Sequence, residues 1–159
     1  MIILPIDPGY DTGLAVVDTK AEKVLWHKTV TGGWKKRNII VETVWIASME
    51  MRLRRPSAYI TVFLIQNPMA HKKIPSFNYS GKQSPISLAK NIGLSSYIYG
   101  RIDEASGTRC KVRIIPPQRG KGMKMDKALF NRLHPEAAGC SEHVRDAVNM
   151  ALGYTEIGG

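Results

Sequence analysis

Apolar residues recur along this chain with two periods, which separate the expected strands from the expected helices. Three short runs rich in Val, Ile, Leu and Trp open the sequence, divided by the turn-forming stretches "PGYD" and "TKAE". Such runs are typical of consecutive antiparallel strands. Two later apolar runs of strand length alternate with segments of helical spacing. The expected strands cover residues 2–7, 12–18, 23–30, 58–66 and 110–115, and the expected helices cover 37–54, 84–107, 124–133 and 141–154.

The helical segments also carry recognisable start and stop signals. Ser84 followed by Pro85 has the form of an N-cap and a first helical residue, Gly107 stops that helix, and Ser141 is expected to cap the last one. The first helix ends before Pro56. The residues expected to face the core are Ile40, Val44, Ala47 and Met51 in the first helix, Leu88, Ile92, Tyr99 and Ile102 in the second, and Val144, Val148 and Leu152 in the last.

The order of these elements predicts the architecture. Three antiparallel strands are followed by a helix that returns the chain to a further strand, so the sequence predicts an α/β fold with a five-stranded mixed sheet, three antiparallel strands and then two parallel ones, flanked by helices. We expect one domain over residues 1–159, because the length suits a single core and no internal repeat or linker interrupts it.

Composition narrows the class of protein. With 43% hydrophobic residues the chain is expected to fold, and its apolar runs are too short for a membrane span. The start "MIILPID" has neither a basic flank nor a small-residue cleavage site, so no secretory signal is expected. Cys110 and Cys140 form no CxxC motif, which argues against a cysteine zinc site and indicates a reducing, cytoplasmic environment.

The formal net charge of +10 makes nucleic acid the leading partner, because binding to a phosphate polymer releases counterions for each charge neutralised. A merely solubilising surface is the alternative reading of the charge alone. The basic residues are clustered, which favours nucleic acid. The clusters are "WKKR" at 34–37, "RLRR" at 52–55, "HKK" at 71–73 and the Gly- and Pro-rich segment 113–127, which reads as a basic loop feeding a helix.

Candidate chemistry lies at the ends of two strands and on the last helix. Asp7 ends an apolar strand just before a Pro-Gly turn, where an aspartate serves either as a compensated buried charge or as an acceptor of turn amides. His143 and Asp146 are three residues apart and therefore share one helix face. Without further information both are compatible with ordinary surface positions. Glu142, next to them, suits the helix N-terminus electrostatically.

Gln66 ends the strand "VFLIQ", where a carboxylate would be easier to explain. Together Asp7, Gln66, His143 and Asp146 form a candidate metal set. Carboxylate, imidazole and amide donors suit Mg²⁺ or Mn²⁺, and two such ions roughly 4 Å apart can clamp a phosphodiester for attack by water. An amide oxygen is a poorer ligand for a hard cation than a carboxylate, so Gln66 is expected to weaken one metal position.

With these pieces in place the chain resembles the RuvC family of Holliday junction resolvases, in the RNase H-like (retroviral integrase) superfamily. The resemblance is carried by "IDPGYDTGLAVVD", by the strand "VFLIQNPMA" and by "HVRDAVNMALGY", and element order agrees over roughly residues 1–155. It implies a metal-dependent endonuclease that binds four-way DNA junctions as a symmetric homodimer and nicks two strands. It also implies an RNase H-like fold and two Mg²⁺ ions, with Mn²⁺ as a substitute.

Carried over by position, the resemblance implies that Asp7 and Asp146 are metal-binding acids and that His143 stands where many relatives have a third acid. At position 66 the family pattern has glutamate, so Gln66 is a departure. We interpret it as a replacement that impairs cleavage and leaves DNA binding intact, whether introduced or natural. The compact size and the unusual segment 70–83 suggest a bacteriophage member, acting in the bacterial cytoplasm.

The resemblance also points to DNA contacts. Met69 stands where the family places an aromatic wedge at the junction centre, with Phe77 and Tyr79 as rival candidates. Lys121 or Lys124 is expected to meet charge on the reacting phosphate. The remaining candidates for contacts to phosphates are Lys35, Lys36, Lys72, Lys73, Lys82, Arg119 and Lys127. Each single lysine is equally compatible with a solvated surface position.

Other readings remain open. The chain could be a branched-DNA-binding protein with a degenerate metal site, or another RNase H-like nuclease that acts on other branched or RNA-containing substrates. An actin-like ATPase also begins with a similar strand and turn, but 159 residues are too few for its second lobe. For the homodimer, the helix that begins at Ser84 is a candidate interface, with Gly93 allowing close approach. The same face could instead pack within the chain.

Overall fold

The computed structural model describes residues 1–57, 59–68, 85–116 and 125–154. Its strands are β1 (Ile2–Asp7), β2 (Asp11–Asp18), β3 (Lys23–Thr31), β4 (Val62–Gln66) and β5 (Lys111–Ile115). Its helices are α1 (Arg37–Arg54), α2 (Pro85–Ser106), α3 (Lys127–Leu133) and α4 (Glu142–Leu152), with short 3₁₀ turns η1 (Gly33–Lys36) and η3 (Pro135–Ala137). The predicted order of strands and helices is confirmed.

The five strands form one mixed sheet in the order β3-β2-β1-β4-β5. β1, β2 and β3 are antiparallel neighbours, whereas β4 and β5 run parallel to β1. The predicted sheet is therefore confirmed in both its antiparallel and its parallel part. β1 lies at the centre and is buried along its whole length, which explains why its sequence is apolar on both faces.

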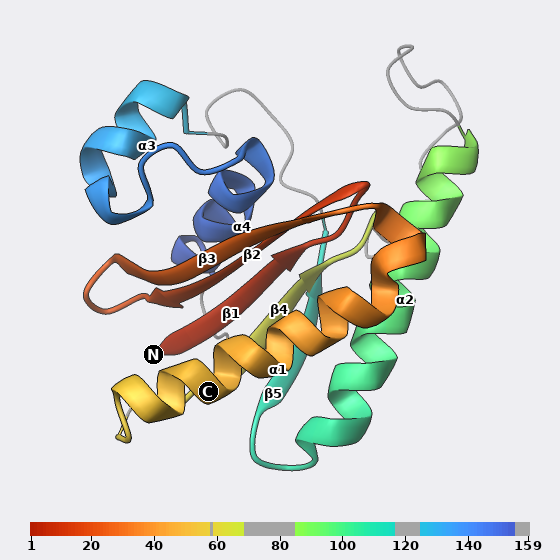
Figure 1. The fold of residues 1–159 in the computed structure, drawn as a ribbon, viewed down its shortest axis with the longest axis horizontal. Helices are drawn as coiled ribbons and strands as arrows, with labels where there is room; N and C mark the ends of the chain where they lie inside the picture. Colours follow the sequence, from red (N-terminus) through yellow and green to blue (C-terminus); the bar gives the residue numbers. More distant parts are fainter. Residues whose placement is uncertain (58, 69–84, 117–124, 155–159) are drawn as a thin grey trace.

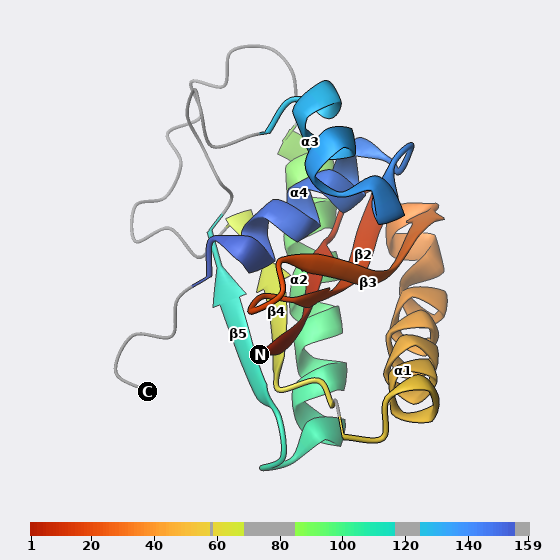
Figure 2. The same ribbon diagram turned by 90° about the vertical axis from the view of Figure 1, so that its left-hand side faces the viewer.

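Helices cover both faces of this sheet (Figures 1 and 2). On one face α1 and α2 pack over apolar residues of β1 and β4 that include Leu4, Ile6, Phe63 and Ile65. On the other face α4 and α3 pack over the alternate positions, such as Ile3 and Leu64. Because side chains of a strand alternate between its two faces, position 7 of β1 belongs to the α4 face.

Most predicted boundaries lie close to the observed ones, and α1 agrees at both ends. Strand β4 is shorter than expected, starting at Val62 and not at residue 58. Its neighbour β1 begins only at Ile2, and the first pair between the two strands is Ile3 with Val62. Thr61, just before β4, still donates its backbone N–H to the Ile2 carbonyl at 2.9 Å, but it lies outside the paired strand. Likewise α3 begins at Lys127, after Asp126 caps it by accepting a hydrogen bond from the Leu129 N–H at 2.8 Å.

The prediction of which α2 residues face the core is only partly confirmed. Leu94, Ile98 and Ile102 are buried, whereas Leu88, Ile92 and Tyr99 are half-buried. The N-terminal half of α2 extends beyond the edge of the sheet (Figure 1), so it has less core to cover. The expected faces of α1 and α4 are confirmed, apart from Leu152, which is half-buried.

No helix in the described ranges is both long enough and apolar enough to cross a membrane.

Glu136 joins η3 to the edge strand β3. Its Oε1 accepts a hydrogen bond from the Val24 N–H at 2.9 Å and lies 3.6 Å from Nδ1 of the buried His134. Burial alone would raise the pKa of Glu136, but the backbone N–H groups and the nearby His134 outweigh it, so the pKa lies below the ordinary glutamate value. The ionised form is therefore the one that the fold stabilises.

We expect Glu136→Ala to lower the free energy of unfolding at neutral pH by about 1–3 kcal/mol, because it leaves the buried Val24 N–H without its acceptor. Glu136→Gln keeps an acceptor oxygen and is expected to cost less. A carboxylate with a depressed pKa contributes stability above its unfolded pKa and loses it as the pH falls through the folded value. The gap between wild type and Glu136→Gln in urea denaturation should therefore shrink below about pH 4. A gap that stays constant with pH would contradict this account.

Candidate active site

Asp7 is the most buried acidic group of the predicted set, with 8% of its surface exposed. It is the last residue of β1, and the next residues turn the chain back into β2. The turn is held by Thr12, whose buried Oγ1 donates to the Gly9 carbonyl at 3.1 Å and accepts from the Gly9 N–H at 3.4 Å. These bonds stabilise the turn that follows Asp7, so the carboxyl group is held at the end of the central strand.

Gly13 brings α4 to this strand end. It lies opposite Asp7 in the antiparallel pair of β1 and β2. A Cβ built on Gly13 would lie 2.2 Å from both the backbone carbon and the carbonyl oxygen of His143. Only a residue without a side chain permits this contact, so Gly13 allows the first turn of α4 to lie directly on β2, beside Asp7.

The start of α4 is anchored by Ser141, as expected from the sequence. Its Oγ accepts a hydrogen bond from the Val144 N–H at 3.2 Å and lies 2.6 Å from Oγ1 of Thr29 on β3. A capping hydroxyl that is also bonded to the sheet fixes where the helix starts. The position of His143, two residues later, is therefore set by both β2 and β3.

His143 and Asp7 meet at this point. Nδ1 of His143 lies 3.2 Å from Oδ2 of Asp7. This hydrogen bond raises the pKa of His143 above its usual value, against the effect of partial burial. The negative charges of Asp7, Asp11 and Asp146 raise that pKa further. The site therefore has a negative potential that favours a cation, either the imidazolium itself or a bound metal ion.

Gln66 lies level with Asp7 on the neighbouring strand. β1 and β4 are parallel and pair Ile6 with Ile65, so the next residues of the two strands are Asp7 and Gln66. Both belong to the α4 face of the sheet by strand alternation. Gln66 is half-buried, and its backbone carbonyl accepts a hydrogen bond from Ser95 Oγ of α2 at 2.9 Å.

The predicted residues therefore lie at one end of the sheet, where β1 and β4 end. Asp7 and Gln66 end adjacent parallel strands, and His143 and Asp146 come from α4, which packs on β1 and β2. The carboxylates at positions 7 and 146 suit a hard divalent cation, whereas the imidazole at 143 and the neutral amide at 66 are weaker ligands for it. Among the described residues, however, no three His, Cys, Asp or Glu side chains come together closely enough to hold a metal ion.

Three contributors were missed by the sequence reasoning. Asp11 lies close enough to raise the pKa of His143, Gly13 permits the approach of α4, and Ser95 anchors the end of β4. Gly13 had a usable signal, because a glycine inside an apolar strand often marks close backbone approach. Ser95 lies in the middle of a helix and carried no such signal.

Several predicted DNA contacts lie at the same end of the sheet. Lys35 and Lys36 are exposed in η1, directly after β3 returns to the edge where β1 ends. Next to them the Arg37 guanidinium carbon lies 4.5 Å from the ring centre of Trp34. Lys127 is exposed at the start of α3. The remaining predicted contacts fall outside the described residues: Met69, Lys72, Lys73, Phe77, Tyr79, Lys82, Arg119, Lys121 and Lys124.

This mixed sheet, with α1 and α2 on one face and α4 on the other, is an RNase H-like α/β fold of the RuvC type. Two solved structures carry that assignment. RuvC of Thermus thermophilus in complex with a Holliday junction substrate matches with a TM-score of 0.57 and 18% identity, over 96% of this chain and 90% of that one. A second T. thermophilus RuvC structure matches with a TM-score of 0.54 and 16% identity, over 96% and 92%.

The fold predicted from the resemblance is therefore confirmed. No family model and no curated protein matches the sequence.

Proposed function

We propose that this chain binds four-way DNA junctions and that it is a metal-dependent endonuclease that resolves them. One observation carries the proposal: Asp7 and His143, 136 residues apart in the sequence, meet at 3.2 Å at the end of the central strand of a RuvC-type fold. The net charge of +10 supports a nucleic-acid partner. A solved structure of the same fold, at 18% identity, holds a Holliday junction substrate.

In this proposal Asp7, Gln66, His143 and Asp146 hold two Mg²⁺ ions, for which Mn²⁺ substitutes. When bound, such ions lower the pKa of coordinated water and neutralise charge on the phosphate. The protein's own part is to hold Asp7 rigidly, through the β1–β2 turn, and to bring α4 to it over Gly13. Lys121 or Lys124 would meet charge on the phosphate during hydrolysis. With an amide at position 66, we propose that cleavage is slow and that junction binding is retained.

A homodimer is part of the proposal, because a four-way junction has two-fold symmetry and paired nicks need two sites. The candidate interface is α2. A Cβ added to Gly93 would meet no atom of the described ranges within 4 Å, and the same holds for Gly100, one heptad later. The residues that face the sheet lie on the other side of the helix, at Leu94, Ile98 and Ile102. Among the described residues Gly93 therefore serves no close approach, which leaves this face available to a second copy.

The second candidate function, favoured by Gln66 itself, is a branched-DNA-binding protein without cleavage. A substrate panel separates the possibilities. We expect a labelled four-way junction to bind at least about tenfold more tightly than linear duplex of the same length, in gel-shift titrations at about 0.15 M salt. Equal affinity for duplex would contradict the proposal.

Nicking is measured on the same panel, extended to three-way, flap and RNA–DNA hybrid substrates, with and without Mg²⁺. Preferential cutting of hybrids or flaps would assign the chain to another RNase H-like activity. The matched control is Asp7→Asn, which keeps the size of the side chain and removes its charge. It should abolish any nicking that belongs to this site. Light scattering of the free protein gives its stoichiometry.

A further inference from the structure

A pocket of about 680 Å³ lies between the ends of α1 and α2, far from the candidate active site. Its apolar lining includes Ile60 and Phe63 of the core cluster on the α1 and α2 face of the sheet, and Trp45, which packs against that cluster. Ile60 and Cys110 precede β4 and β5, so the pocket sits where these parallel strands begin. Asp7 and Gln66 sit where the strands end, on the opposite face. The two sites are therefore separated by the thickness and the length of the sheet.

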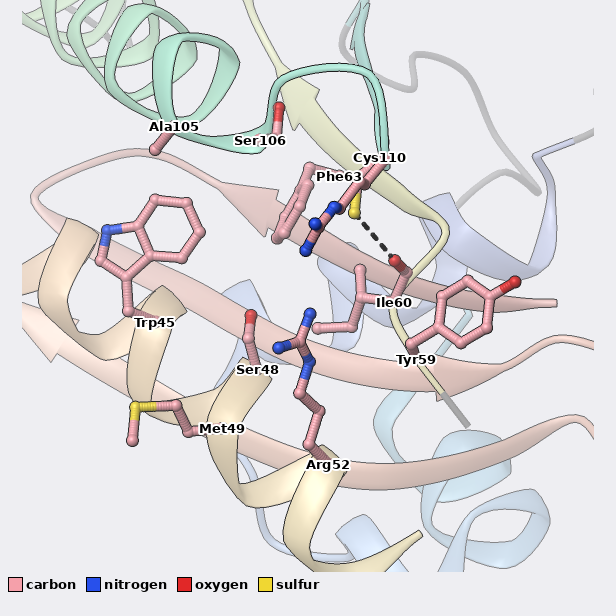
Figure 3. Close-up of a pocket in the computed structure, with 11 residues that line it drawn as sticks. Trp45, Ser48, Met49, Arg52, Tyr59, Ile60, Phe63, Ala105, Ser106 and Cys110 are labelled. Atoms are coloured by element: carbon pink, nitrogen blue, oxygen red, sulfur yellow. Dashed lines mark hydrogen bonds between the residues drawn. The ribbon is translucent and has the colours of Figure 1, made fainter. Parts of the chain in front are cut away.

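The pocket has an aromatic interior and an apolar rim. Trp45 meets Phe63 edge to face, with ring centres 6.2 Å apart. Met49 and Tyr59 at the rim are 64% and 58% exposed. In Figure 3 Trp45 and Tyr59 stand on opposite sides of the pocket, and the side chain of Arg52 extends between them. Large apolar side chains around a hollow of this size mark a place where an apolar group can bind.

The charged side chains that line the pocket in the described part of the chain are all basic. Arg52 and Arg109 line it, and none of the lining residues in the described part of the chain is acidic. Glu50, close to Arg52 in sequence, lies 3.6 Å from Arg54 and pairs with it outside the lining. The C-terminal ends of α1 and α2, with their free carbonyl groups, carry only a partial negative charge. The two full positive charges of the guanidinium groups exceed it.

One of the basic clusters of the sequence lies away from the candidate active site. The cluster "RLRR" at 52–55 is one of the basic clusters that favoured a nucleic-acid partner, but it lies at the C-terminal end of α1. That end is remote from Asp7, because α1 starts at the site edge after β3 and runs back along the sheet (Figure 1). Arg54 pairs with Glu50 there, whereas Arg52 lines the pocket.

We propose that this pocket binds an acidic peptide segment of a partner protein. In this arrangement a large apolar side chain of the peptide enters between Trp45 and Tyr59, and its carboxylates pair with Arg52 and Arg109. Guanidinium groups bind carboxylates with two parallel hydrogen bonds, and aromatic pockets with charged rims hold anchor residues of this kind. A second copy of this chain, with its net charge of +10, is a poorer electrostatic match than an acidic segment.

Peptide binding at this pocket goes beyond the proposed function and does not rest on it, whereas the recruitment of a DNA-bound protein does. Because the pocket and the candidate active site lie on opposite faces, a bound peptide would leave the DNA-facing edge open. The pocket would then serve to recruit the protein to a partner while it holds DNA.

The test uses a fluorescein-labelled peptide, Asp-Glu-Asp-Asp-Leu-Phe, and the full chain at about 0.15 M salt, read by fluorescence anisotropy. Two control peptides separate the contributions: Asn-Gln-Asn-Asn-Leu-Phe has fewer charges, and Asp-Glu-Asp-Asp-Ala-Ala lacks the anchor. We expect each control to bind at least about fivefold more weakly than the probe. Equal binding of either control peptide would overturn the proposal.

Protein variants locate the binding. The double variant Arg52→Gln, Arg109→Gln should weaken the probe about tenfold, since two ion pairs are lost. The matched control is Arg54→Gln, which removes a charge from the same cluster outside the pocket and should change affinity less than twofold. A thermal melt of each variant checks that the fold is intact. Equal effects of the pocket and control variants would contradict the proposal.

Cys110 gives a second readout that does not depend on charge. Its thiol lines the pocket and lies 3.2 Å from the Ile60 carbonyl. In a Cys140→Ser background, the probe should slow alkylation of Cys110, and the alanine-ended control should not. Unchanged alkylation at saturating probe would count against a peptide in the pocket.

Two further outcomes would overturn the proposal in favour of another occupant. Loss of oligothymidine binding in the double variant, with Arg54→Gln unaffected, would make the pocket a nucleic-acid site. Dissociation of a dimer in the double variant, seen by light scattering, would make it a contact between two copies.

Discussion

Replacing Gln66 with glutamate is expected to raise metal-dependent nicking of four-way junctions by about 100-fold. A metal clamp on a phosphodiester contributes several kcal/mol, and each 1.36 kcal/mol changes a rate tenfold. The expectation rests on the proposed function. It applies to the rate of cleavage, measured in single turnover with Mg²⁺ and again with Mn²⁺.

The register of the sheet makes position 66 decisive for metal binding. The pair Ile6 and Ile65 places Gln66 level with Asp7 on adjacent parallel strands, so a carboxylate at position 66 would stand next to the buried carboxyl group of Asp7. Two neighbouring carboxylates repel each other unless cations separate them, which is what makes such a pair bind divalent ions. An amide gives neither the repulsion nor the charge.

The matched control is Gln66→Met, which is similar in size and has no oxygen donor. It should cleave no faster than the parent chain, and junction binding should be unchanged in both variants. A readout independent of activity is the effect of Mg²⁺ on thermal unfolding, because a ligand that binds only the folded state stabilises it. Mg²⁺ should raise the melting temperature of Gln66→Glu more than that of the parent. If Gln66→Glu nicks junctions no faster than the parent chain with either metal, the hypothesis that the amide at position 66 impairs cleavage is contradicted.

Gly13→Ala is expected to disrupt the site and to destabilise the fold by about 3 kcal/mol. The added Cβ would lie 2.2 Å from backbone atoms of His143, and a backbone at a helix start cannot rotate away as a side chain can. Overpacking of this kind typically costs 1–3 kcal/mol, sometimes more. Relief of the clash requires α4 to move off β2, which takes His143 away from Asp7.

Urea denaturation gives the stability of this variant, and the titration of His143 by NMR reports the contact with Asp7. The hydrogen bond to Asp7 raises the pKa of His143, so separation of the two residues should lower it. At protein concentrations where light scattering shows a monomer, so that the candidate dimer face of α2 is free, Gly100→Ala is the control, because a Cβ there would meet no described atom within 4 Å. Alanine is a better helix former than glycine, so this variant should be neutral or slightly more stable. A Gly13→Ala protein with normal stability and an unchanged His143 pKa would contradict the packing described here.

The local pattern of residues was sufficient for most of the fold. The spacing of Ile40, Val44, Ala47 and Met51 identified α1 and its buried face, since helical periodicity is a property of neighbouring residues. Capping at Ser141 was predictable for the same reason. The motif around Asp7 and the pair His143 and Asp146 pointed to one strand end and one helix face, and the resemblance to the RuvC family brought them together.

Features that depend on residues far apart along the chain could not be predicted from the local pattern. β4 begins at Val62, which pairs with Ile3 of β1, some 60 residues earlier in the sequence. α2 buries Leu94 and Ile98, and leaves Leu88 half-buried, because part of the helix lies beyond the sheet.

The meeting of Asp7 with His143 depends on Gly13, whose missing side chain admits a helix more than 120 residues away. The pocket arises only where the C-terminal parts of α1 and α2 spread apart over the starts of β4 and β5 (Figure 1). Periodicity and capping are short-range properties that a sequence carries in each segment, whereas strand register, helix approach and pockets are set by which distant segments pack together.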